Sequence, residues 1–277
     1  MLYGVLPEKV DLRDYKVCSA NIDVEYPEEF LLENLPKVKD QGRVNSCCPH
    51  ATSSILEYHD GNKTDLSTNF FYGIQKKLCC QLGEGMYLAD ACKIAKSYGD
   101  MTEKDCPGNT EVPECRKVAE ASFADYKKRA TAKKYKIKSY YSCKSSNDIK
   151  YALMNYGPVL CSVYWRERYI VEKDGTVIFN ENTMGGLHAI MVVGWNQKGW
   201  VFQNSWGTSF AQKGRGIIPF EHGIREAKVL VDETDESSES DAALVVPANN
   251  TRLSDMFYKL VNLILNAFNK SSKSCIK

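Results

Sequence analysis

Hydrophobic residues follow a helical repeat in the first half of the chain and gather in short runs in the second half. Two stretches, from Ser46 to about Tyr58 and from Leu88 to Tyr98, carry small and apolar residues at the spacing of a helix face. Pro49 fits the first of these helices, because amides of the first helical turn have no intrahelical acceptors. A third helix is predicted from Asn147, as its cap, through Met154, since Gly157-Pro158 follows.

After Pro158 the pattern changes to β-branched and aromatic runs separated by glycine, asparagine and lysine. These runs predict antiparallel strands over residues 159–164, 176–179, 189–194 and 199–203. Helices first and strands later predict an α+β fold with two lobes and a site in the cleft between them. We place one domain at residues 1–231, with a helical lobe over roughly 37–129 and an antiparallel β-sheet or barrel lobe over roughly 130–231 plus the N-terminal segment.

Two further segments of this domain are polar. Residues 1–36 are predicted to be loop-like, because Pro7, Pro27 and Pro36 limit helix formation. Residues 127–138 hold seven Lys or Arg. We expect a solvated crossover strand there, since lysines commonly protect exposed strand edges; a basic patch that binds a partner is the alternative.

The C-terminal tail has its own organisation. Residues 232–250 are predicted to be an acidic linker, because six acids and three serines lie between Asp232 and Asp241. Residues 251–277 are predicted to form an amphipathic helix, over 253–268, followed by a basic tail. This helix either docks on the domain or on a second copy, or lies on a membrane surface with help from Lys270, Lys273 and Lys277.

The overall charge gives no reason to expect nucleic acid as a partner, because 36 basic and 35 acidic residues nearly cancel. Neither a secretory signal nor a long apolar span is recognisable in the sequence. These features predict an intracellular, cytoplasmic protein, or one packaged in the virion if the source is viral.

The 11 cysteines are then expected to be free thiols in a reducing compartment. Cys106 and Cys115 are close enough in sequence to leave a small disulfide loop open as an alternative. No Cys-x-x-Cys pair occurs, so we expect neither a metal nor any other cofactor.

One set of residues predicts nucleophilic catalysis by a thiol. Cys47 follows a Gln-Gly turn, His188 lies 141 residues later, and Asn204 comes after it. A thiol, a base and a group that orients the base are the parts such a site needs. The helix start at Cys47 and an imidazolium at His188 are both expected to favour the thiolate. The Gln41 amide is a candidate donor to the oxyanion, together with the Cys47 amide.

At these residues the chain resembles the papain-like (family C1) cysteine peptidases, from about Pro7 to Val231. The resemblance rests on the order and spacing of six short motifs: Val38-Lys-Asp-Gln-Gly, Ser46-Cys47, Gly157-Pro-Val, Leu187-His-Ala, Asn204-Ser-Trp-Gly and Gly214-Arg-Gly. It implies a papain-like two-lobe fold and a polypeptide substrate.

The resemblance also assigns roles to single residues. It makes Cys47 the nucleophile, His188 the base and acid, Asn204 the orienter and Gln41 the oxyanion residue. Trp206 would shield the bond between histidine and asparagine from water. The family pairs its backbone with the substrate at Gly83–Leu88, and the candidate substrate-binding residues are Gly85, Tyr87, Leu187, Ala189 and Trp206.

The chain departs from the family in three ways. Val44 and Gly83 stand where members commonly have two cysteines joined by a disulfide. Asn45 and Met86 replace residues that are often glycine beside the bound peptide. No long propeptide is recognisable, so self-inhibition by the usual route is not expected, and the chain resembles bacterial and large-DNA-virus peptidases of this kind most.

These observations predict a cysteine-type endopeptidase that forms a thioester on Cys47. Two alternatives stay open. One is a catalytically silent scaffold that recruits partners through its C-terminal helix, and the other is an acyl transferase that uses the same residues.

Overall fold

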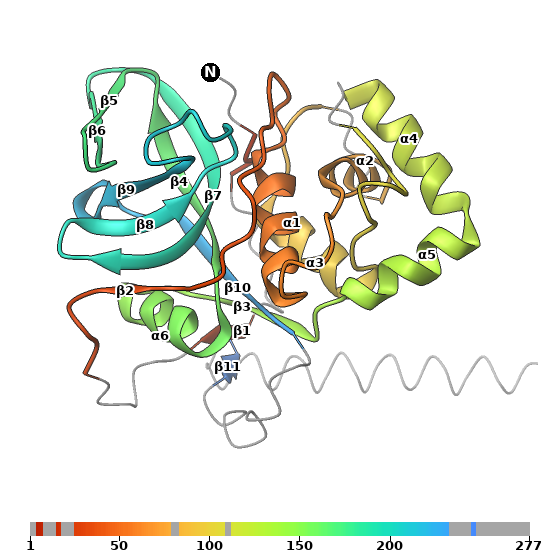
Figure 1. Cartoon of the computed structure of the whole chain (residues 1–277), viewed down its shortest axis with the longest axis horizontal. Coiled ribbons are helices and arrows are strands. Elements are labelled where there is room, and N and C mark those ends of the chain that lie inside the picture. The colour runs from red at the N-terminus through yellow and green to blue at the C-terminus, as the bar shows by residue number, and fades with distance from the viewer. Residues whose placement is uncertain are drawn as a thin grey trace, which may run out of the picture.

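The computed structural model describes residues 4–7, 15–17, 25–78, 83–108, 112–232 and 245–247. Its helices and strands separate into two halves that lie side by side (Figure 1), which confirms the predicted α+β two-lobe fold. The helical half contains α1 (Cys47–His59), α2 (Thr68–Leu78), α3 (Leu88–Ser97), α4 (Val112–Ala124), α5 (Tyr126–Ala132) and the 3₁₀ turn η1 (Lys133–Tyr135).

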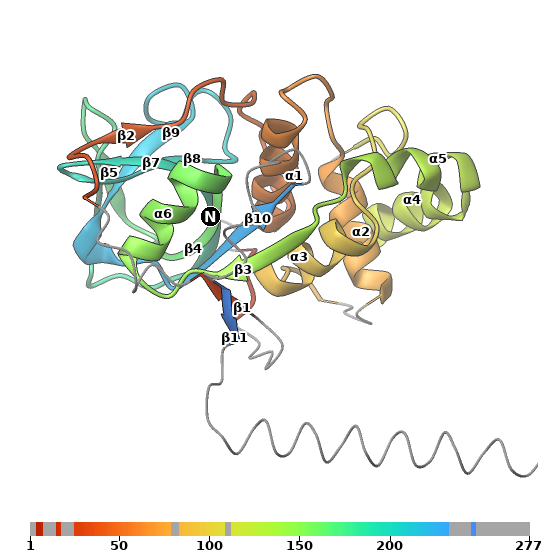
Figure 2. The ribbon, with the colours of Figure 1, turned by 90° about the horizontal axis from the view of Figure 1, so that it is seen from below.

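The other half is built on one large sheet with strand order β11-β1-β3-β10-β4-β7-β8-β9, and β2 pairs with β7. A separate hairpin joins β5 and β6, and α6 covers one side of the sheet (Figure 2). The bounds are β1 (Tyr15–Val17), β2 (Phe30–Leu31), β3 (Ser139–Ser142), α6 (Ser146–Tyr156), β4 (Val159–Arg166), β5 (Tyr169–Val171), β6 (Val177–Phe179), β7 (Gly185–Asn196), β8 (Gly199–Gln203), β9 (Arg215–Pro219), η2 (Phe220–His222), β10 (Glu226–Val231) and β11 (Val245–Pro247).

The register of the sheet places the predicted site residues. Strands β4 and β7 pair antiparallel, with His188 opposite Val163. Strand β8 pairs with β7 on its other side, with Gln203 opposite Met191, so Asn204 emerges from β8 beside the strand that carries His188. Helix α1 packs against β7, which brings its first residue, Cys47, to the same place.

Each half has a core of its own. One buried cluster joins α1, α2 and α3 to the α1-facing side of the sheet, and it includes Phe70, Ile55 and Leu160. A second cluster fills the sheet half around Trp165 and Trp195. The site therefore lies where two separately packed halves meet.

Two predictions about local structure were wrong. Helix α6 is capped by Ser145 and not by Asn147, because the Ser145 hydroxyl accepts the Asp148 amide while the Asp148 carboxylate accepts the Ser145 amide. Residues 127–138 are not a crossover strand: they begin in α5, whose first amides are capped by the Asp125 carboxylate, and continue into η1.

Short strands also occur in segments predicted to be loop or linker. Residues 15–17 form β1, and residues 245–247 form β11 within the predicted 232–250 linker. Neither run has a strong period of its own, and the two strands exist because they pair with each other and with β3. The rest of the segment after Asp232, including the predicted helix 253–268, lies outside the described residues.

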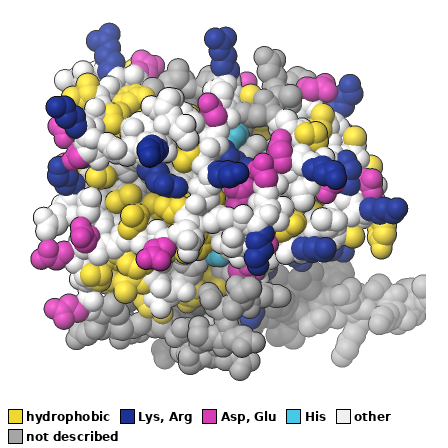
Figure 3. Space-filling view, viewed as in Figure 1, with side chains coloured by type: hydrophobic (Ala, Val, Ile, Leu, Met, Phe, Trp, Pro, Cys, Tyr) yellow, Lys and Arg dark blue, Asp and Glu magenta, His cyan; other side chains and the backbone are white. Residues whose placement is uncertain are grey.

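The described cysteines are free thiols and all are buried: Cys47, Cys48, Cys92, Cys106, Cys115, Cys143 and Cys161. Cys106 and Cys115 therefore do not form the small disulfide loop. Among the described residues, no helix has both the length and the apolar character needed to cross a membrane. Basic and acidic side chains are interspersed over the face shown in Figure 3.

Candidate active site

Cys47, His188 and Asn204 meet at the junction of the two halves. Cys47 is the first residue of α1 and is fully buried. The amide of Ala189, the residue after His188, donates to the Cys47 sulfur at 3.4 Å. Helix and sheet thus bring together residues that are 141 positions apart in the sequence.

A hydrogen bond fixes the orientation of His188. Its Nε2 lies 2.8 Å from Oδ1 of Asn204, and the same oxygen accepts the Ser205 amide at 2.8 Å. Because Oδ1 is an acceptor in both contacts, Nε2 of His188 carries the hydrogen. The buried Nδ1 has no hydrogen-bond partner among the described residues, so it is the nitrogen left to take a proton from Cys47.

Aromatic rings surround this pair. The Trp206 ring lies 4.6 Å from the His188 ring at an interplanar angle of 31°, and the Trp165 ring lies edge-on at 5.3 Å. Such packing excludes water from the bond between His188 and Asn204. This position of Trp206 fits the shielding role that the sequence predicted more directly than contact with a substrate.

Gln41 is held beside the start of α1. Its Oε1 accepts the Ser205 hydroxyl at 2.6 Å, and its Nε2 donates to the Val44 carbonyl at 2.9 Å. A carboxamide has two N–H groups, so one remains available to an oxyanion near the Cys47 amide. The sequence analysis did not identify Ser205, whose hydroxyl orients the Gln41 carboxamide.

Burial keeps the two reactive groups neutral. It raises the pKa of the Cys47 thiol to about 11, although the amides of Ala189 and Gly4 lower it. Burial also lowers the pKa of His188 to about 4, against the bond from Asn204, which raises it. The expected thiolate is therefore absent in this conformation, because the cost of desolvating a charge exceeds the gain from the helix start.

An N-terminal strap, which we define as residues 4–6, lies against Cys47. Its backbone crosses the site between the two halves: Val5 donates to the Leu187 carbonyl at 3.2 Å and Leu6 to the Met86 carbonyl at 3.1 Å. The Met86 amide in turn donates to the Gly4 carbonyl at 2.8 Å. Val5 and Met86 thus form a parallel β-bridge.

The strap presents an amide, and not a carbonyl carbon, to the nucleophile. The Gly4 amide donates to the Cys47 sulfur. A side chain at Gly4 would have its Cβ 2.4 Å from the Asn45 carbonyl oxygen and 2.9 Å from the Cys47 sulfur, so only glycine fits. The side chain of Val5 is buried in the cluster that contains Cys47 and Met86. The strap lies within the segment predicted to be loop-like, residues 1–36, but the sequence did not indicate that this segment contacts the site.

Trp206, one of the five predicted substrate-binding residues, lies against His188, and the other four divide into two groups. Leu187 and Ala189 contact the strap and the sulfur, and a Cβ added at Gly85 would lie 3.2 Å from the Gly4 carbonyl oxygen. Tyr87 lies behind them as the N-cap of α3, with its carbonyl 4.0 Å from the Cys48 sulfur. Met86, which the sequence marked only as a departure from glycine, makes the main-chain pairing itself.

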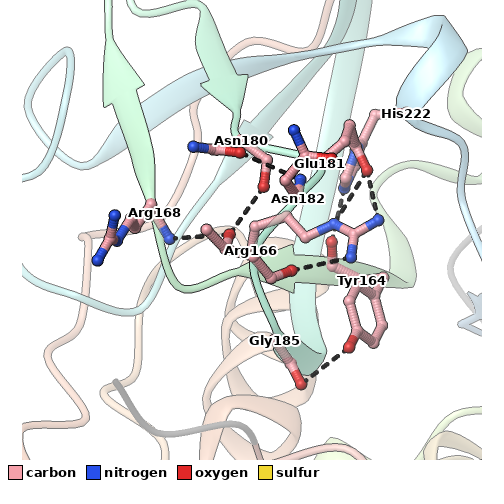
Figure 4. Close-up of polar contacts among 9 residues, drawn as sticks. Tyr164, Arg166, Arg168, Asn180, Glu181, Asn182, Gly185 and His222 are labelled. Carbon is pink, nitrogen blue, oxygen red and sulfur yellow. Dashed lines mark hydrogen bonds and ion pairs between the residues drawn. The ribbon is translucent and has the colours of Figure 1, made fainter.

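A polar network holds the beginning of β7 (Figure 4). Arg166 donates to the Thr183 carbonyl at 3.0 Å and, through Nε, to Glu181 at 3.0 Å. The Tyr164 hydroxyl donates to the Gly185 carbonyl at 3.1 Å. These bonds fix the turn from which the histidine strand starts.

No three His, Cys, Asp or Glu side chains are grouped so that they could hold a metal ion, within the part of the chain that the structure describes.

The family of the chain is shown by comparison. Residues 26–227 match the sequence model described as papain family cysteine protease, and the chain belongs to this family. It is 33% identical over 134 residues to cathepsin B-like cysteine proteinase 3 of Caenorhabditis elegans, over 46% of this chain and 35% of that protein. It is 25% identical over 195 residues to the cathepsin L-like proteinase of Fasciola hepatica, over 64% of this chain and 55% of that protein. The chain thus spans roughly a third to a half of the length of these relatives.

Solved structures share the fold. Xylellain, a cysteine protease from Xylella fastidiosa, superposes with a TM-score of 0.68 at 23% identity, over 83% of this chain and 96% of that one. The proCathepsin B S9 of Trypanosoma congolense gives a TM-score of 0.61 at 17% identity, over 84% and 87% of the two chains.

Besides His188, a buried histidine of α1, His50, is predicted to make the folded protein less stable in acid. Burial lowers the pKa of His50 to about 4, and its Nδ1 lies 2.7 Å from the Ser46 carbonyl. In the unfolded chain the His50 imidazole takes up a proton near its ordinary pKa of about 6.5, whereas in the folded chain it stays neutral down to about pH 4. Protonation therefore favours the unfolded chain, and the free energy of unfolding falls as the pH is lowered from 6.5 toward 4. At pH 5 the loss amounts to about 2 kcal/mol.

Urea unfolding at pH 7 and pH 5 measures this loss. The buried Asp100, whose pKa is raised by burial, acts in the opposite direction, so the comparison is made between the wild type and His50→Gln. We expect the variant to lose less stability than the wild type between the two pH values. Equal losses would show that His50 does not titrate on unfolding.

Proposed function

We propose that the protein is a cysteine-type endopeptidase that cleaves polypeptides through a thioester on Cys47. One observation carries this proposal: Asn204 holds Nε2 of His188 and leaves the unpartnered Nδ1 as a base, next to a residue whose amide contacts the sulfur. Family membership supports the same chemistry.

We assign each step of the proposed reaction to a group of the site. When the site opens, the Cys47 thiol gives its proton to Nδ1 of His188, and the sulfur attacks the peptide carbonyl carbon. The oxygen, now an anion, accepts hydrogen bonds from the Cys47 amide and the Gln41 carboxamide. As the C–N bond breaks, His188 returns the proton to the leaving amine, and a thioester remains. Water, deprotonated by His188, then attacks the thioester and releases the acid and the thiol.

The substrate is proposed to be an extended polypeptide that takes the place of the strap. Met86 offers one amide and one carbonyl to it, and the Leu187 carbonyl accepts a third main-chain bond.

A thiol-reactive epoxide probe followed by peptide mapping tests the proposal. We expect the label on Cys47, the first residue of α1, and not on Cys48, which is equally buried and follows it in the helix. A peptide assay with an added amine gives the second readout, for which we expect hydrolysis products. Transfer of the acyl group to the amine as the main product would instead support an acyl transferase.

A further inference from the structure

Two side chains of α2 hold the backbone of Gly85 from the side opposite the strap. The Tyr72 hydroxyl accepts the Gly85 amide at 3.1 Å, and Nζ of Lys76 donates to the Gly85 carbonyl. Tyr72 and Lys76 are four residues apart and therefore lie on the same face of the helix. One helix face thus satisfies both polar groups of one backbone residue.

The burial of these side chains shows that the contacts are specific. Tyr72 is 1% exposed and Lys76 is 0% exposed. Burying a lysine is costly unless its amine finds partners. Here Nζ lies 4.6 Å from the centre of the Tyr72 ring, in addition to its bond to Gly85. A lysine without such buried contacts is expected at the surface, where its neighbour Lys77 lies.

Holding Gly85 fixes the direction of the next residue. Gly85 has φ +82°, a left-handed conformation that favours glycine, and its own polar groups face α2. Met86 then faces the other way, where its amide and carbonyl pair with Gly4 and Leu6 of the strap. The contacts of α2 with Gly85 therefore orient the Met86 amide and carbonyl, which pair with the strap.

We propose that Tyr72 and Lys76 are positioning residues for peptide hydrolysis, which hold Gly85 so that Met86 can pair with the substrate backbone. This inference rests on the proposed function. In the segments of Val44 and Gly83, family members commonly have a disulfide that this chain lacks. Tyr72 and Lys76 lie at this place in the fold. Val44 packs with Tyr72 and Cys115 in one small buried cluster, so Tyr72 contacts the first of these segments and bonds the second.

Steady-state kinetics of Tyr72→Phe and Lys76→Met test the proposal. Both variants are made in the full chain that also carries Gly4→Ala, so that the strap does not compete with the substrate. We expect kcat/KM to fall about tenfold through KM, with kcat changed by less than about twofold, because one main-chain pairing is weakened. Lys77→Met, on the exposed side of the same helix, is the matched control and is expected to behave as its parent.

A methylated substrate series separates positioning from folding. Each backbone amide of the peptide is methylated in turn, and one position is expected to cost the parent about tenfold, because it removes the donor to the Met86 carbonyl. Methylation at that position should lower the kcat/KM of Tyr72→Phe clearly less than that of its parent. An equal fall in kcat and in the rate of Cys47 alkylation, with an unchanged methylation cost, would overturn the proposal in favour of a purely structural role.

Hydrogen exchange gives a readout that does not depend on turnover. In the otherwise unaltered chain, Tyr72→Phe is expected to speed exchange of the Met86 and Leu6 amides about tenfold, since both belong to the pairing that Gly85 aims. Unchanged exchange at both amides would overturn the inference. A parent protein that hydrolyses no peptide would contradict the proposed function, while the exchange result would still decide the role of the α2 pair.

Discussion

Replacing Cys47 by Ala is expected to lower peptide hydrolysis about 10⁴-fold or more, to the background of the assay. The sulfur is the group that bonds to the substrate carbon, and no other described thiol accepts an amide from the residue that follows His188. Hydrolysis of a fluorogenic peptide by the purified full chain measures the effect, and reaction with a thiol-reactive epoxide should disappear with it.

Cys48→Ala is the matched control for this experiment. The Cys48 sulfur lies 4.0 Å from the Tyr87 carbonyl, and the alanine removes only a buried thiol of similar surroundings. We expect this variant to keep its activity within a few-fold if it remains folded, as circular dichroism would show. Turnover by Cys47→Ala at the rate of the wild type would contradict the assignment of the nucleophile.

Replacing Gly4 by Ala is expected to raise activity about ten- to a hundredfold over the wild type. The new Cβ would lie 2.4 Å from the Asn45 carbonyl oxygen, which belongs to the backbone and cannot easily yield. The strap would then leave the site, with loss of its three main-chain bonds to Leu187 and Met86. The expected factor follows from three bonds at a net value of about 0.5–1 kcal/mol each, or about 1.5–3 kcal/mol in total.

The pKa values of Cys47 and His188 should change when the strap leaves the site. Burial holds the pKa of Cys47 at about 11 and that of His188 at about 4, so both groups are neutral while the strap is in place. Admitting water lowers the first pKa and raises the second, which favours transfer of the thiol proton to the imidazole. Alkylation of Cys47 by iodoacetamide at pH 7 should therefore be faster in Gly4→Ala, by a factor similar to the gain in hydrolysis.

Gly83→Ala is the control for this second prediction. It adds the same methyl group, but no other atom of the described residues lies within 4 Å of the added Cβ, its chain neighbours aside. Its activity should match that of the wild type. Equal hydrolysis and equal alkylation in Gly4→Ala and the wild type would show that the strap leaves the site without cost and does not restrain the enzyme.

The sequence predicted the class of fold and the parts of the site because both depend on local signals. Helical spacing places α1 and α3 within one residue of their observed ends, and the β-branched runs give the strands β4, β7 and β8. The catalytic residues carry motifs of fixed order. Their assignment as catalytic remains a prediction that the experiments above test.

Other elements could not be predicted because their stability comes from partners distant in sequence. Strands β1 and β11 have three residues each and form only by pairing. Helix α5 lies in a lysine-rich stretch whose pattern resembles that of an exposed strand edge. The Asp125 carboxylate, which accepts the first amides of the helix, favours the helix there.

By itself the sequence determined that a thiol, an imidazole and two amides are present in the order of the papain family, on helix and strand ends. Only the tertiary structure decided their state. It places Gly4 against the sulfur and Tyr72 and Lys76 behind Gly85, contacts that no spacing encodes. The physical reason is desolvation: the charge on Cys47 and His188 depends on what covers them. Gly4 at the sulfur and Trp165 and Trp206 at the imidazole come from other segments of the chain.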